Sequence, residues 1–206
     1  MRNYKPGGNK IMSKKAIKTK EYKKLLEYME NDHDLRAATK EKYLKAFTFL
    51  YYTGCRINEV LKLKGEDIES IIRTQKVKLL MSKTARFKGQ EFRTIEFSDK
   101  AVKQIKKVFE SSLHHSDGYC LNAWNNKNKS LNIISFTNAL NSYIKKALND
   151  PDYGTHSFRR GILTEMIIDN NVVPEVAQLF IGHRNYSTTS GYIKATQQDV
   201  RNSLVR

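Results

Sequence analysis

The sequence predicts a mainly α-helical domain with one small antiparallel β-sheet. Apolar residues recur at intervals of three and four over most of the 206 residues, which is the period of helices with one buried face. Two short segments instead alternate apolar and polar residues, and a polar, glycine-containing stretch separates them as in a hairpin. The hydrophobic content of 39% is that of a globular chain, and a chain of this length builds a core without disulfides.

The first half of the chain predicts a basic arm followed by three helices. Residues 1–17 are rich in Lys, Arg and Gly and offer little to bury, so we expect a loose arm there. Helices are expected from about Lys18 to Asp32, from Ala38–Thr39 up to a carboxyl-terminal cap at Gly54, and from Arg56 to Leu63. The apolar faces that predict them are Tyr22, Leu25, Leu26 and Met29; Tyr43, Phe47, Leu50 and Tyr51; and Ile57, Val60 and Leu61.

The second half predicts the sheet and four more helices. The strands are marked by alternation at Val77, Leu79 and Met81 and at Arg93, Ile95 and Phe97. Ser98 is expected to cap a helix, and an Asn- and Lys-rich loop is expected from about Ser111 to Lys129. Later helices are expected around Ile133–Ala147, after His156 and from Pro174.

Charge indicates the class of partner. Lys and Arg number 37 against 21 acidic residues, which gives a net charge of +16. Such a field attracts polyanions, and nucleic acid is the first expectation, although a generic basic protein would have the same charge. No apolar run reaches the length of a membrane span, and the first 20 residues lack the apolar stretch of a secretory signal. With only two cysteines, Cys55 and Cys120, we expect a soluble protein of the cytoplasm or another DNA-containing compartment.

Four segments combine residue types that suit chemistry at a phosphate. They are TGCRINEVL at Thr53–Leu61, SKT at Ser82–Thr84, HSFR at His156–Arg159 and GHRNYSTTSGY at Gly182–Tyr192. Taken singly, each also fits an ordinary structural role, such as a helix cap, a solvated hairpin or a packed tyrosine. In this order they resemble the tyrosine recombinase family, which includes phage integrases, Xer-type recombinases and fimbrial switch invertases. The family pattern is TGxRxxEL, a hairpin lysine, HxxR, and GH followed nine residues later by tyrosine.

The resemblance implies a site-specific recombinase that cleaves and rejoins DNA through a 3′-phosphotyrosyl intermediate on Tyr192. Arg56 and Arg159 would bind the non-bridging phosphate oxygens, because a guanidinium stays charged and forks onto two oxygens. His156 is the candidate base for the tyrosine, whose ordinary pKa of ~10 makes it a poor nucleophile at neutral pH. His183 would donate a hydrogen bond to the phosphate.

The general-acid lysine, the acidic companion of Arg56 and the contacts to the DNA backbone complete the predicted site. The leaving 5′ oxygen needs a proton, and either Lys83 or Lys88 fits the family's hairpin lysine; we prefer Lys83 because of its Ser-Lys-Thr context. Glu59, three residues after Arg56, is expected to orient its neighbours. We expect backbone contacts to DNA from Lys88 and from Arg86, Arg160 and Arg184.

The same resemblance predicts partners and organisation. Double-stranded DNA is the expected partner, with a homo-tetramer assembled on it, no metal, no other cofactor and no membrane. Residues 18–206 would form the catalytic domain, with residues 193–206 as a tail helix. Most integrases carry a further DNA-clamping domain before this one, so the chain resembles either the short invertases or a fragment. A DNA-binding protein without turnover, a topoisomerase and a telomere resolvase are the alternative functions.

Overall fold

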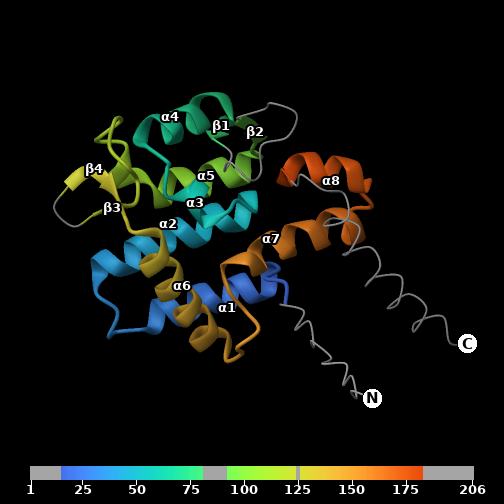
Figure 1. Ribbon diagram of the computed structural model, residues 1–206, viewed down its shortest axis with the longest axis horizontal. Coiled ribbons are helices and arrows are strands. Elements are labelled where there is room, and N and C mark those ends of the chain that lie inside the picture. The colour runs from blue at the N-terminus through green and yellow to red at the C-terminus, as the bar shows by residue number, and fades with distance from the viewer. Residues whose placement is uncertain (1–14, 81–91, 124–125, 183–206) are drawn as a thin grey trace, which may run out of the picture.

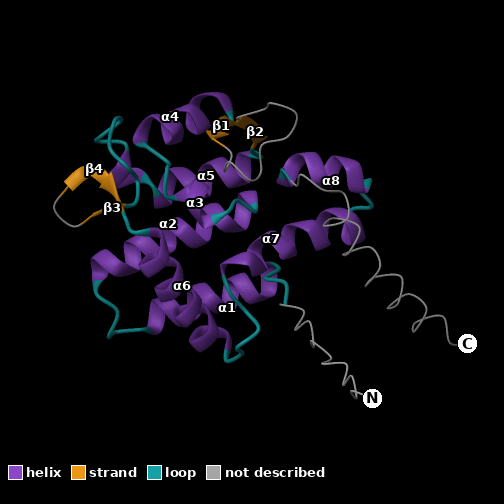
Figure 2. Ribbon diagram, viewed as in Figure 1, coloured by secondary structure: helices purple, strands orange, loops and turns teal. Residues whose placement is uncertain are grey.

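A computed structural model describes residues 15–80, 92–123 and 126–182 (Figure 1). In chain order, the first elements are α1 (Thr19–Asn31), α2 (Ala37–Thr53), α3 (Ile57–Val60), α4 (Gly65–Thr74), β1 (Lys76–Leu80) and β2 (Phe92–Glu96). They are followed by α5 (Asp99–Val108), a 3-10 turn (Glu110–Ser112), β3 (Asn122–Ala123), β4 (Asn126–Ser130), α6 (Ile133–Leu148), α7 (Thr155–Thr164), a π-helical turn (Glu165–Asp169) and α8 (Pro174–Ile181). Figure 2 shows that helices dominate the described residues and that the strands lie at the edges.

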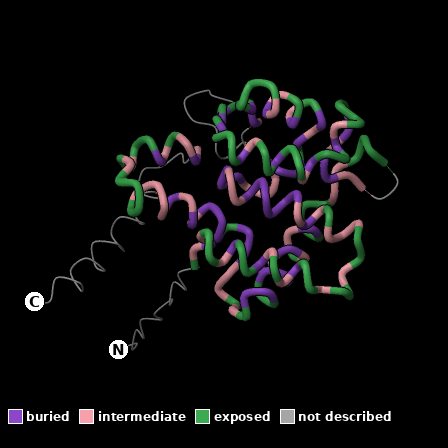
Figure 3. Tube along the Cα trace, turned by 180° about the vertical axis from the view of Figure 1, so that it is seen from behind, coloured by how far each residue is buried: buried purple, intermediate pink, exposed green. Residues whose placement is uncertain are grey.

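Helix α2 is the centre of the core. It packs against α1, α3, α5 and α7, so it is buried nearly all round rather than along one stripe. Phe47, Phe49 and Leu50 are fully buried, and Phe47 stacks on Phe158 of α7 with ring centroids 5.8 Å apart. Figure 3 shows these buried stretches running through the inside of the body, with the exposed residues outside. The predicted apolar face of this helix is therefore correct but too narrow.

Strands β1 and β2 confirm the predicted antiparallel pair. Val77 is opposite Ile95, and Leu79 is opposite Arg93. The inward positions alternate with exposed ones, as the sequence pattern predicted. Arg93 thus takes an inward position in a strand whose other inward residues are apolar, and this placement governs the site described below.

Most predicted helices are present with nearly the expected bounds. Gly54 ends α2 in the left-handed conformation (φ 58°), the Ser98 side chain accepts from the Ala101 N–H, and Pro174 begins α8. Helix α3 is shorter than expected because it ends at Val60. Packing also begins before Lys18, since Ile17 is buried and its N–H donates to the Ser157 carbonyl at 2.9 Å.

Two features differ from the sequence prediction. Helix α4, which packs on β1, was not expected. The region expected to be a loop from Ser111 to Lys129 contains a 3-10 turn and most of a second antiparallel sheet, β3–β4. Strand β4 is almost entirely exposed and polar, so it lacks the apolar alternation by which strands are recognised. In the described part of the chain, no helix is long and apolar enough to cross a membrane.

Candidate active site

The site begins where α2 ends. Gly54 turns the chain in the left-handed conformation, and α3 starts after Arg56, whose N–H donates to the Glu59 carboxylate at 3.1 Å. A carboxylate on the third helical residue that binds the preceding N–H is a capping interaction. The same local structure therefore fixes the backbone of Arg56 and the side chain of Glu59.

Glu59 is a buried carboxylate held by two arginines. Its side chain is 2% exposed, and it accepts from Nη2 of Arg93 at 2.9 Å and from Nη1 of Arg56 at 3.5 Å. The Arg93 side chain is 7% exposed, whereas that of Arg56 is 28% exposed. Arg56 is thus the member of this group that retains contact with solvent, while Glu59 and Arg93 lie behind it.

Arg159 comes from α7 and is also buried. Its Nη1 donates to the Gly54 carbonyl at 2.8 Å and its Nη2 donates to the Ile181 carbonyl at 2.8 Å, which uses two of the five N–H donors of a guanidinium. Burial, followed by the nearby charges of Arg56 and Arg93, lowers the pKa of Arg159 to about 9. The side chain therefore remains charged at neutral pH.

Helix α8 meets this group at its carboxyl-terminal end. The Phe180 carbonyl accepts from Nη1 of Arg93 at 2.5 Å, next to the Ile181 carbonyl that Arg159 binds. Gly182, in the left-handed conformation, closes the helix by donating to the two carbonyls before these. Two arginines thus satisfy the last open carbonyls of α8 and meet the negative end of its dipole.

The group carries a net positive charge. Three guanidinium groups, those of Arg56, Arg93 and Arg159, lie near the one carboxylate of Glu59, so the formal charges of these four side chains sum to +2. Cys55 adds a thiol whose sulfur accepts from Nη2 of Arg93 at 3.1 Å, and burial raises the pKa of Cys55 to about 11. A neutral thiol beside a cationic group of side chains is compatible with binding an oxyanion rather than with thiolate chemistry.

Two other predicted site residues lie on the same helix as Arg159, and the rest lie outside the described residues. His156 is exposed on α7, one turn before Arg159, and Arg160 follows on the same helix with partial exposure. Tyr192, His183, Lys83, Lys88, Arg86 and Arg184 lie outside the residues that the structure describes. Of the predicted catalytic residues, the structure therefore brings Arg56, Glu59 and Arg159 together.

Sequence reasoning assigned no site role to Arg93 or Cys55. A signal for Arg93 was present, because a charged residue at an inward strand position must find a buried partner. Glu59, also expected near the site, is that partner. No comparable signal marks Cys55, since a buried cysteine is common in any core.

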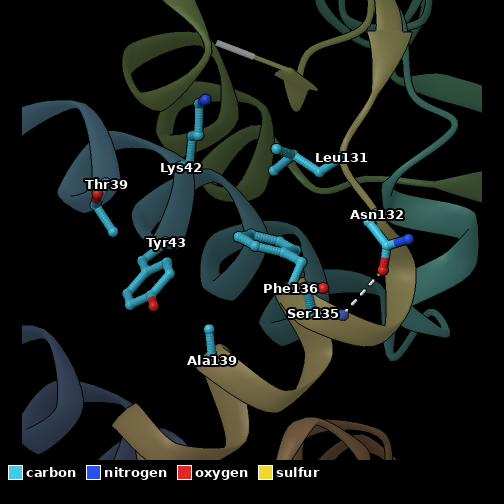
Figure 4. A pocket seen from close by; sticks show the side chains of 8 residues that line it. All are labelled: Thr39, Lys42, Tyr43, Leu131, Asn132, Ser135, Phe136 and Ala139. Carbon is cyan, nitrogen blue, oxygen red and sulfur yellow. Dashed lines mark hydrogen bonds between the residues drawn. The ribbon is translucent and has the colours of Figure 1, made fainter.

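A separate cavity of about 320 Å³ lies between α2 and α6 and shares no residue with the arginine group. The side chains that line it, drawn in Figure 4, are Thr39, Lys42, Tyr43, Leu131, Asn132, Ser135, Phe136 and Ala139. Within the described ranges, no three His, Cys, Asp or Glu side chains come close enough together to hold a metal ion.

Guanidinium groups that are fixed by backbone carbonyls and a buried carboxylate are suited to binding phosphate oxygens. Comparison with known proteins gives the family. The chain belongs to the phage integrase family, whose profile matches residues 15–199.

Relatives agree with this assignment. A tyrosine recombinase from Thermosipho africanus is 26% identical over 189 residues, which cover 87% of this chain and 56% of that protein. The tyrosine recombinase XerC of Staphylococcus saprophyticus is 26% identical over 155 residues, covering 74% of this chain and 49% of the relative. The chain therefore spans about half the length of these relatives.

Solved structures share the fold. The XerA recombinase covers all of this chain with a TM-score of 0.64 at 18% identity, and the alignment covers 68% of that protein. The XerH site-specific recombinase, in a post-cleavage complex with a palindromic difH substrate, aligns over 93% of this chain and 52% of its own with a TM-score of 0.67 at 17% identity. The predicted class, the mainly helical fold of tyrosine recombinase catalytic domains, is confirmed.

Proposed function

We propose that this chain is the catalytic domain of a site-specific DNA recombinase that cleaves and rejoins strands through a 3′-phosphotyrosyl intermediate on Tyr192. The observation that carries the proposal is the group of Arg56, Glu59 and Arg159, contributed by α3 and α7, in a member of the phage integrase family. The relatives named tyrosine recombinase, and the similar fold of the XerH site-specific recombinase in its post-cleavage complex, support the same activity.

In the proposed reaction, the Tyr192 oxygen attacks phosphorus and the bond to the 5′ oxygen breaks. His156 accepts the phenol proton, and Lys83 or Lys88 supplies a proton to the departing 5′ oxygen. The reverse steps, with a 5′ hydroxyl from another strand as the attacking group, reseal the DNA. The phosphotyrosine retains the energy of the phosphodiester, so the strand exchange requires no nucleotide.

The arginines supply the electrostatic part of the mechanism. The pentavalent transition state carries about two negative charges on its oxygens, and the guanidinium groups of Arg56 and Arg159 are cations that can meet that charge. Arg56, which is partly exposed, and Arg159 would bind the non-bridging oxygens, with His183 donating a further hydrogen bond. Because the guanidinium groups of Arg56 and Arg159 are held by Glu59 and by backbone carbonyls before the substrate arrives, little reorganisation of them accompanies the reaction.

The proposed partner is double-stranded DNA, in the cytoplasm or another DNA-containing compartment. Arg86, Lys88, Arg160 and Arg184 would contact its backbone, as the net charge of +16 favours. Since strand exchange joins the ends of two duplexes, we propose a homo-tetramer assembled on two sites. Integration, excision and inversion use the same chemistry and differ in the arrangement of these sites.

A nicked duplex substrate tests the proposal. A nick close to the cleavage site lets the short 5′ fragment diffuse away, so a true strand transferase accumulates as a covalent protein–DNA adduct that resists denaturing electrophoresis. We expect an adduct with the wild-type chain and none with Tyr192→Phe, which keeps the aromatic ring but lacks the attacking oxygen. Tyr186→Phe is the matched control and should form the adduct.

The alternative functions give different results in this assay. A DNA-binding protein without turnover would shift the duplex in a native gel and form no adduct, which would contradict the proposal. A topoisomerase or a telomere resolvase would form the adduct, and then the topology of the products on supercoiled DNA with paired sites would distinguish them from a recombinase.

A further inference from the structure

Arg93 connects three parts of the site although it contacts no position assigned to the substrate. It lies on β2, and its side chain is almost completely buried. Its Nη2 donates to Glu59 of α3 and to the Cys55 sulfur, and its Nη1 donates to the Phe180 carbonyl at the end of α8. One planar group thus holds β2, the start of α3 and the end of α8 at fixed distances.

This placement is costly unless it has a purpose beyond packing. A buried charge needs a strong partner. An apolar side chain of similar size would suit the inward face of the β1–β2 sheet, which otherwise presents Val77, Leu79 and Ile95. The Nε of Arg93 is buried without a hydrogen-bond partner in the described structure, so the side chain is not optimally satisfied for stability alone.

We propose that Arg93 is a positioning residue for the phosphate-binding group, an inference that rests on the proposed recombinase function. The Arg93–Glu59 ion pair holds the carboxylate that contacts Arg56, so Arg93 sets the direction of the Arg56 guanidinium. By binding the Phe180 carbonyl, Arg93 also fixes the end of α8, three residues before His183 in the sequence. Strand β2, which follows Lys83 and Lys88 in the sequence, is therefore joined through Arg93 to both α3 and α8.

Lysine cannot reproduce these contacts. Arg93 donates from two terminal nitrogens, Nη2 toward Glu59 of α3 and Nη1 toward the Phe180 carbonyl of α8. An ammonium is instead a single point charge with rotating donors. We expect Arg93→Lys to reduce the rate of covalent adduct formation at least about tenfold while the Kd for DNA changes less than about threefold, because small displacements of reacting groups have large effects on rate. Arg73→Lys, at an exposed position on α4, is the matched control and should behave as the wild type.

A neutral substrate separates positioning from general loss of structure. In a methylphosphonate duplex, one non-bridging oxygen is replaced by a methyl group, so the phosphorus centre loses the charge that Arg56 and Arg159 would bind. If Arg93 acts through Arg56, then Arg93→Lys lowers the ratio of phosphodiester to methylphosphonate cleavage, as Arg56→Lys does. If Arg93→Lys instead lowers both cleavage rates by the same factor, so that their ratio equals that of the wild type, the proposal is overturned.

A second variant keeps the test decisive if Arg93→Lys folds poorly. Replacing the buried ion pair by apolar residues, as in Arg93→Met with Glu59→Leu, often preserves or raises stability. We expect this double variant to recover the melting temperature without recovering cleavage. Recovery of both would show that the pair serves stability only. Absence of adduct in the wild-type chain would instead refute the recombinase function, which is a different result from normal cleavage by Arg93→Lys.

Discussion

A guanidinium that donates to two backbone carbonyls is held in one orientation before any ligand arrives. Arg159 is held in this way between Gly54 and Ile181, which belong to segments more than a hundred residues apart in the sequence. Holding it there leaves little conformational entropy to be lost when a phosphate binds. The orientation of this arginine thus depends on how α2 and α8 end, and both helices end at a glycine.

Arg159→Lys keeps the charge but loses this arrangement. One ammonium cannot span both carbonyls and a phosphate, so we expect covalent adduct formation on the nicked duplex to fall at least about a hundredfold. DNA affinity, measured by gel shift, should change only a few-fold because the overall charge is retained. Near-normal cleavage by this variant would assign Arg159 to scaffolding rather than to the phosphate.

Cys55 predicts a loss of stability at alkaline pH. Burial raises the pKa of its thiol from 9.0 to about 11, so between these values the unfolded chain releases the proton and the folded chain does not. The contribution of the protonated Cys55 thiol to the free energy of unfolding is fully present below pH 9. It is lost as the pH rises toward 11, by an amount on the order of 2 kcal/mol. Urea unfolding at pH 8 and pH 10.5 should show a smaller alkaline loss for Cys55→Ala than for the wild type. Equal losses would mean that other groups account for the pH dependence.

At the scale of elements, the crossing of residues 15–17 over α7 depends on a glycine. A Cβ atom on Gly161 would lie 2.0 Å from the Ile17 carbonyl oxygen, a distance that no side chain tolerates. The backbone of residues 15–17 is also tied to α7 by the bond from the Ile17 N–H to the Ser157 carbonyl. This segment therefore belongs to the packed domain.

Gly161→Ala should accordingly displace residues 15–17 from α7. We expect a loss of about 1–3 kcal/mol in the free energy of unfolding, the range for overpacking a close contact. Gly118→Ala is the control, since its added Cβ would meet no atom closer than 3.4 Å and should cost less than about 1 kcal/mol. The expected difference is readily measured by thermal or denaturant unfolding, and equal effects of the two substitutions would contradict it.

Elements with a clear local pattern could mostly be predicted from the sequence, although α4, which buries Ile68 and Ile71, was not. The strands at Val77 and Ile95 alternate cleanly, and Gly54 and Pro174 mark helix ends through their own backbone preferences. Strand β4 is exposed on both faces, so its formation depends on pairing with β3 rather than on a local pattern.

At the scale of the whole molecule, the same distinction holds for the site. Arg56, Glu59 and Arg159 were identified because the sequence motifs that contain them resemble those of the tyrosine recombinase family. The role of Arg93 depends on where β2 lies relative to α3 and α8, which only the tertiary structure gives. Long-range contacts of this kind leave no periodic signal in a sequence.

The net charge of +16 makes two opposite predictions about salt. In the free protein, like charges repel each other in the compact state, so screening by added salt should raise the melting temperature. In the complex with duplex DNA, the native state is stabilised by binding, and that stabilisation should fall as salt weakens the phosphate contacts. The two melting temperatures should therefore converge as the salt concentration rises.

The convergence can be measured by thermal unfolding of the wild-type chain with and without a saturating nonspecific duplex. With several phosphate contacts, affinity should fall roughly a thousandfold between about 50 and 200 mM salt, so most of the DNA-induced shift should disappear over that range. The unfolded chain carries the same charge and also binds DNA, which reduces the shift at every salt concentration but does not remove it, because only the folded chain holds its cations in a fixed arrangement. A DNA-induced shift that does not depend on salt would contradict binding through the phosphate backbone, and the absence of any shift at low salt would contradict binding of duplex DNA by the folded chain.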